Sequence, residues 1–210
     1  MDSELQKTAP AATPANLSGT AVNQTGSKNI YVNRADKVKF VYNILGTPSR
    51  GGGQLFDTHY YNLFVLFGTE LPTGYFIMQK ERALEDFYTQ PEIKARYSGL
   101  APAMVEEIKA FPAIIANEST GREEQLAICA EITGVRAQEN GVKVHFRPLF
   151  YIPQNQLIES AEKFALGPSG KAYELSHTHW AIKNMNLFEE LMEAGIDFVL
   201  PESLTDGNQG

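Results

Sequence analysis

The feature that most constrains this chain is a pair of strand-like segments joined by a short turn signal. Residues 126–135 and 142–150 both alternate apolar and polar side chains, and Glu139-Asn140-Gly141 lies between them. Asn-Gly between alternating segments is the strongest short-range hairpin signal, because a type I′ turn needs positive φ at both central positions. The sequence therefore predicts a β-hairpin and, with it, a compact core that contains β-structure.

The same two segments predict an irregularity in the hairpin. Counting outward from an Asn-Gly turn pairs Phe146 with Val135, but the apolar residues upstream of Val135 have the opposite parity. One extra residue corrects the parity, and Gly134 is the natural position for such a β-bulge. Pro148 has no N–H to donate, so the second strand is expected to lie at a sheet edge or to bend there.

Length and composition favour one domain with tails. The chain has 210 residues, of which 43% are hydrophobic, enough to build a sizeable core. Residues 1–28 are rich in Ala, Thr, Ser, Pro, Asn and Gln without periodicity, which predicts a disordered tail. We therefore expect a single α+β domain over residues 29–200 and a flexible C-terminal tail over residues 201–210.

Charge and cysteine usage exclude several classes of protein. The net charge of −7 gives no general attraction to nucleic acid or to anionic membranes. No apolar run approaches the ~18 residues of a membrane span, and the first residues lack the features of a signal peptide. The single cysteine, Cys129, lies in the apolar alternation and is expected to be a core residue of a protein from a reducing compartment. These features predict a soluble, cytoplasmic protein without membrane association.

Periodicity and turn residues predict the other strands and helices of the chain. A dense apolar run predicts a central strand at 60–67 whose hairpin partner is 75–79. Residues 37–45 fit either a strand or a helix, with aromatic and β-branched residues favouring a strand. Further helices are expected at 81–88, 102–110, 154–165 and 187–194, a short strand at 113–116, and extended chain at 173–182. The fold class is therefore α+β, with an antiparallel sheet that could form a partly open barrel and short flanking helices.

One cluster has the spacing of metal ligands. His177 and His179 are two residues apart, so on a strand both rings would face the same side, and Asp57 and His59 have the same spacing. Together they could hold a divalent transition metal. The alternative is that His179 and Trp180 pack and form hydrogen bonds near the start of a helix, while His177 is solvated.

A second candidate site is a basic segment with interleaved aromatic residues. Lys37, Lys39 and Arg50 fall in a part of the chain with little opposing charge, a pattern used in single-stranded nucleic acid grooves. Arg136 and His145, expected to pair across the hairpin, could extend this surface. The alternative is an ordinary amphipathic strand with lysine outside and aromatic residues inside.

No catalytic motif occurs in the sequence, and no catalytic residue can be assigned. The leading hypothesis is a non-enzymatic binding or interaction module without a cofactor, with a ligand, a protein or a nucleic acid as its partner. The alternative hypothesis is a metal-dependent hydrolase or nuclease that uses the histidines and Asp57. The sequence identifies neither the partner nor the oligomeric state.

Overall fold

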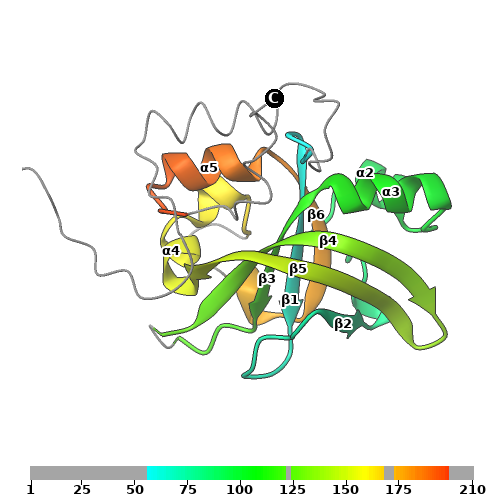
Figure 1. Ribbon diagram of the computed structural model, residues 1–210, viewed down its shortest axis with the longest axis horizontal. Helices are drawn as coiled ribbons and strands as arrows, with labels where there is room; N and C mark the ends of the chain where they lie inside the picture. Colours follow the sequence, from blue (N-terminus) through cyan, green and yellow to red (C-terminus); the bar gives the residue numbers. More distant parts are fainter. Residues whose placement is uncertain (1–55, 122–123, 168–172, 199–210) are drawn as a thin grey trace, which may run out of the picture.

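The computed structural model describes residues 56–121, 124–167 and 173–198. Its centre is a six-stranded mixed sheet with strand order β2-β5-β4-β3-β1-β6, covered by short helices on both faces (Figure 1). The strands are β1 (Tyr60–Leu66), β2 (Tyr75–Met78), β3 (Pro112–Asn117), β4 (Leu126–Gln138), β5 (Gly141–Pro153) and β6 (His179–Asn184). The helices are η1 (Lys80–Arg82), α2 (Pro91–Tyr97), α3 (Pro102–Ala110), α4 (Gln154–Glu159), η2 (Ala161–Phe164), η3 (Tyr173–Ser176) and α5 (Leu187–Glu193).

The α+β class is confirmed, but the expectation of an antiparallel sheet is wrong for one central pair. β1 and β3 run parallel, with Leu63 opposite Ile114. The chain leaves β1, adds β2 at the far edge of the sheet against β5, and returns through α2 and α3 to form β3. The predicted pairing of 60–67 with 75–79 is therefore wrong, and Phe76 pairs with Val144 instead. The sheet is open, with β2 and β6 at its edges.

The two edges of the sheet differ in how they are covered. Ala83 forms a bridge with Trp180 of β6, and the Glu85 N–H donates to the Trp180 carbonyl oxygen at 3.2 Å. The segment that follows β2 thus runs along the outer edge of β6. In the part of the chain that the structure describes, no strand lies against the outer edge of β2.

The hairpin of β4 and β5 is confirmed, and so is an irregularity at Gly134, where the register shifts between Ile132 and Gly134. The predicted type I′ turn is wrong. Gln138 pairs with Gly141, so the turn residues are Glu139 and Asn140. The residues with positive φ in the described chain include neither Asn140 nor Gly141.

Close approach of β2, and not turn geometry, explains the glycine at position 141. A Cβ atom at Gly141 would overlap the carbonyl oxygen of Met78 and touch the Ile77 side chain. Glycine is the residue that permits such an approach between two backbones. Gly141 therefore allows β2 to join the sheet beside β5.

We predict that Gly141→Ala destabilises the protein by about 1–3 kcal/mol, because β2 must move to make room for the methyl group. Urea unfolding followed by circular dichroism measures the change. Gly99→Ala is the matched control, since a Cβ at Gly99 meets nothing within 4 Å. Equal stability of the two variants would contradict the claim that Gly141 permits the close approach of β2 to β5.

Helix ends follow local signals only in part. α5 begins at the predicted residue, and its N-cap is Asn186, whose side chain accepts a hydrogen bond from the Glu189 N–H at 3.4 Å. The predicted helix 81–88 is wrong: only the short η1 forms there, and α2 begins at Pro91, where the predicted helix was to end. Proline starts a helix well because its missing N–H has no intrahelical partner at that position. No helix in the described chain is long and apolar enough to cross a membrane.

Two apolar clusters lie on opposite faces of the sheet. α4, η2 and α5 cover one cluster, while α2 and α3 cover the other. Cys129 is fully buried in the first cluster, as predicted, and burial raises the pKa of its thiol well above the usual value. Because the native state keeps this thiol protonated, the stability of the fold depends on pH.

We predict that stability falls as pH rises above about 8.5, where an unfolded cysteine loses its proton. The unfolded state then binds fewer protons than the native state, so the Cys129 contribution declines by about 1.4 kcal/mol per pH unit. Urea unfolding at pH 7 to 10 measures this slope. Cys129→Ala should lack this component of the decline, and an unchanged slope in that variant would refute the assignment.

Candidate functional site

A pocket of about 550 Å³ opens where the C-terminal ends of β1 and β3 meet the start of β6 and the edge of β2. We call it the strand-end pocket. The parallel pairing of β1 and β3 places both strand ends together. Its lining combines apolar and polar side chains: Leu66, Phe67, Glu70, Pro72, Phe76, Ile77, Met78, Gln79, Arg82, Asn117, Glu118, His177 and Thr178. This size is typical of small-ligand pockets.

Two residues at the end of β3 carry its most informative polar groups. Asn117 is only 4% exposed, and its Oδ1 has no hydrogen-bond partner among the residues that the structure describes. A buried amide oxygen without a donor is costly, so it marks a position where a ligand or water is expected. Rotation of the amide about its last bond exchanges oxygen and nitrogen, which lets Asn117 offer an acceptor on either side.

Glu118 joins the two walls of the strand-end pocket. Its Oε1 accepts hydrogen bonds from the Thr178 N–H at 2.8 Å and the Thr178 hydroxyl at 2.6 Å. Its own N–H donates to the Leu66 carbonyl oxygen at 2.9 Å. The second carboxylate oxygen of Glu118 accepts no hydrogen bond from the residues that the structure describes. Glu118 therefore holds Thr178 with one oxygen, and no described residue donates to the other.

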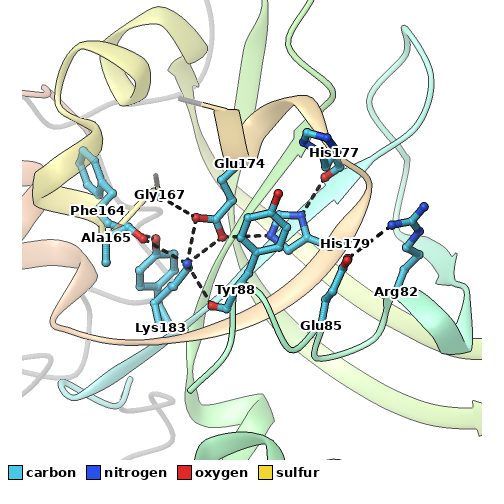
Figure 2. Close-up of polar contacts among 11 residues, drawn as sticks. Arg82, Glu85, Tyr88, Phe164, Ala165, Gly167, Glu174, His177, His179 and Lys183 are labelled. Carbon is cyan, nitrogen blue, oxygen red and sulfur yellow. Dashed lines mark hydrogen bonds and ion pairs between the residues drawn. The ribbon is translucent and has the colours of Figure 1, made fainter. Parts of the chain in front are cut away.

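Behind the His177–Thr178 wall lies a buried group of charged side chains, the Glu174 network, made of Glu174, His179 and Lys183 (Figure 2). Glu174 comes from η3, and the other two come from the same face of β6. Glu174 Oε1 lies 3.0 Å from His179 Nε2 and 2.7 Å from Lys183 Nζ. Glu174 and His179 are fully buried and Lys183 is 8% exposed. A buried carboxylate is tolerated only when it is paired in this way.

Both ring nitrogens of His179 face oxygen atoms. Nδ1 lies 2.7 Å from the His177 carbonyl oxygen, and Nε2 lies against Glu174. Because a carbonyl oxygen only accepts hydrogen bonds, Nδ1 donates to His177, while Nε2 shares its hydrogen bond with the Glu174 carboxyl group. The ring also packs on Tyr88, with centroids 4.2 Å apart, and has no surface left for a ligand.

Lys183 is surrounded by acceptors. Its Nζ donates to Glu174 Oε2 at 2.9 Å and to the carbonyl oxygens of Tyr88 and Ala165 at 3.2 and 3.1 Å, and it lies 2.7 Å from Glu174 Oε1 in an ion pair. Burial lowers the pKa of the Lys183 amine, and the Glu174 carboxylate opposes that shift. Tyr61 lies nearby, and its hydroxyl donates to the Phe164 carbonyl oxygen at 2.6 Å. Burial is the main cause that raises the pKa of this hydroxyl, and the negative charge of Glu174 adds to the shift.

The Glu174 network positions the pocket wall without touching the strand-end pocket itself. His179 fixes the His177 carbonyl, and Glu174 Oε2 accepts from the Gly167 N–H at 2.9 Å. These bonds hold η3 and the chain around Gly167 against β6. His177 and Thr178 follow η3 directly, so their positions in the pocket wall depend on the Glu174 network.

The four residues of the predicted metal site do not form one site. Asp57 and His59 lie before β1, where Asp57 accepts from the His59 and Tyr60 N–H groups at 2.6 and 2.9 Å. Val65, at the other end of β1, pairs with His179. Seven residues of strand therefore separate the two pairs by roughly 20 Å. Within the described ranges, no group of three or more His, Cys, Asp or Glu side chains could hold a metal ion.

His177 and His179 also diverge, because β6 begins only at His179. His177 precedes the strand and lines the strand-end pocket, whereas His179 points into the core (Figure 2). The structure supports the part of the alternative in which His179 packs and forms hydrogen bonds, but it does so at the start of a strand and not of a helix, and His177 is half-buried.

The predicted basic surface is only partly placed. Lys37, Lys39 and Arg50 lie outside the described residues. Arg136 and His145 are exposed on one face of the hairpin, but they are not directly paired. The turn at Glu139–Asn140, in place of one at Asn140–Gly141, changes the partners.

Arg136 instead lies opposite Lys143, and His145 lies opposite Gly134. The Lys143 amine lies 4.2 Å from the centroid of the Tyr75 ring, which is itself a neighbour of His145. These residues form a small basic and aromatic strip on the outer face of β2, β5 and β4.

No protein-family model matches this chain, and no curated protein or solved structure is similar to it at a significant level. The site is therefore defined by its own geometry. Sequence patterns did not reveal Asn117, Glu118, Glu174 or Lys183 as a site. The first two looked like the start of a polar loop, and the network partners are joined only when η3 folds against β6.

We predict that Glu174→Gln destabilises the protein by about 3–5 kcal/mol, because it leaves the buried Lys183 amine without its carboxylate. Glu193→Gln is the control, since Glu193 is exposed and lies 3.3 Å from Lys163 in a surface ion pair. That change should cost less than about 1 kcal/mol. Urea unfolding measures both, and similar losses in the two variants would show that the Glu174 network is not a structural support.

Proposed function

We propose that this protein is a cytoplasmic, non-enzymatic binding module and that its ligand occupies the strand-end pocket. The observation that carries the proposal is the buried Oδ1 of Asn117, which has no hydrogen-bond partner among the described residues, in the lining of an open pocket that Glu118 also lines. A ligand with hydrogen-bond donors would satisfy both groups at once. The buried, unpaired thiol of Cys129 fits a reducing compartment.

The apolar part of the lining supports binding as well. Phe67 is 85% exposed at the rim, and Ile77 is 44% exposed on the edge strand. Large apolar side chains beside a few convergent polar groups are typical of ligand sites, because the apolar surface contributes affinity and the polar groups orient the ligand. Burial of these two side chains by a ligand would remove apolar surface from water.

The histidines give less support to the hydrolase alternative. His179 is engaged at both ring nitrogens and fully buried, so it lacks access to a substrate or a metal-bound water. Asp57 and His59 are at the opposite end of β1. The arrangement favours a role for His179 in positioning the pocket wall.

We predict that small polar fragments with an apolar part bind the full-length protein at the strand-end pocket. A fragment library screened by ligand-observed NMR would detect them, and isothermal titration calorimetry would give the affinities. Gln79→Trp, which adds bulk to the pocket lining, should weaken the hits at least about tenfold. Tyr151→Ala, an exposed change outside the lining, is the control and should bind like the unaltered protein.

Two results would overturn this proposal. Fragments that bind the Gln79→Trp variant as tightly as the unaltered protein would place the site elsewhere. Hydrolysis of reporter esters or phosphodiesters at a rate that scales with protein concentration, and that Gln79→Trp abolishes, would make the strand-end pocket an active site.

A further inference from the structure

The outer edge of β2 forms one side of the strand-end pocket. The lining includes Phe76, Ile77, Met78 and Gln79, which are consecutive. Successive side chains of a strand point to opposite faces, so a pocket that touches all of them runs along the edge of the strand. The main chain of β2 is therefore part of the binding surface.

The hydrogen-bond pattern shows which main-chain groups of β2 point toward this edge. The Phe146 N–H donates to the Gly74 carbonyl oxygen at 3.0 Å, which makes these two residues a hydrogen-bonded pair. Such pairs alternate along an antiparallel ladder, so Phe76 bonds to β5 while the N–H and C=O groups of Tyr75 and Ile77 point outward. An edge of this kind accepts an added strand.

The charges at the strand-end pocket favour a cation. Glu70 and Glu118 line it, and the positive charge of Arg82 is already offset by Glu85, whose carboxylate lies 3.5 Å away. The available acceptors are the free oxygen of Glu118 and the Oδ1 of Asn117. A group with several N–H donors and a positive charge matches this set.

We propose that the ligand is an extended peptide that adds as a strand to the outer edge of β2 and places one lysine or arginine side chain in the strand-end pocket. The main chain pairs with Tyr75 and Ile77, and the basic side chain projects to the face of the sheet that carries Phe76 and Met78. Glu118 and Asn117 accept its hydrogen bonds there. This inference rests on the proposed binding function and names its ligand class.

Nine-residue synthetic peptides test the charge requirement. They contain Thr and Val with a central arginine, citrulline or glutamate, and calorimetry with the full-length protein measures their affinity. Citrulline keeps the shape of arginine without its charge, so it should weaken binding about tenfold or more, and glutamate should abolish binding. Equal affinities of the three peptides would overturn the cationic assignment.

Methylguanidine and a backbone-methylated arginine peptide test strand addition. N-methylation at alternate residues removes the donors that would face β2, so the peptide with those changes should lose about tenfold or more in affinity. Methylguanidine should bind far more weakly than the intact peptide. If it binds as tightly, the ligand is a free cation and the β2 edge has no role.

Protein variants complete the test. Ile77→Pro removes an outward N–H while leaving the bonds to β5, a position that an edge strand tolerates, and should abolish peptide binding. Glu118→Gln keeps an acceptor for Thr178 and should remove the preference for arginine over citrulline. Glu159→Gln, an exposed change outside the pocket lining, is the matched control and should bind normally.

The outcomes separate this inference from the proposed function. Fragments that bind the strand-end pocket when no peptide does would leave the proposed function intact and overturn the peptide assignment. Conversion of a dimer to a monomer by Ile77→Pro in sedimentation experiments would identify a second copy as the occupant of the edge, which also overturns it.

Discussion

The carboxylate of Glu174 is the constraint on which the rest of this structure depends. A charge without access to water is tolerated only when partners neutralise it and fill its hydrogen-bonding positions. β6 supplies both side-chain partners, His179 and Lys183, and the Gly167 N–H supplies a further donor. This requirement ties η3 to β6 and thereby sets the position of the pocket wall that follows η3.

The second consequence concerns the edges of the sheet. After β2 the chain crosses to the opposite edge, where Ala83 and Glu85 cover β6, so β2 remains the open edge among the described strands. The parallel pairing of β1 with β3 brings two strand ends to the same place beside β2. A free strand edge, an apolar rim and acceptors at the strand ends are thus neighbours, which is why binding is the function that this arrangement supports best.

Local sequence patterns predicted the secondary-structure elements better than they predicted which elements and side chains contact one another. The β4–β5 hairpin, the bulge near Gly134, and α3 and α5 all agree with the sequence analysis, since apolar periodicity and turn residues act over a few residues. The prediction of a type I′ turn was wrong because position 141 needs glycine for its close approach to Met78 of β2, and not for positive φ in a turn. The prediction of a metal site was wrong because two residues that are two positions apart share a face only when both belong to a strand. His177 lies before β6 begins, so its side chain does not share a face with that of His179.

The sequence by itself determined that the chain builds an α+β core, where its main hairpin lies, and that Cys129 belongs to the interior. These properties depend on apolar periodicity and on local backbone preferences, which residues a few positions apart decide together. Only the tertiary structure decided that β1 lies parallel to β3, that β2 joins β5, and that Asn117 and Glu118 face Thr178. Those choices depend on which buried surfaces and hydrogen-bonding groups meet across long separations in the chain, and no local pattern records them.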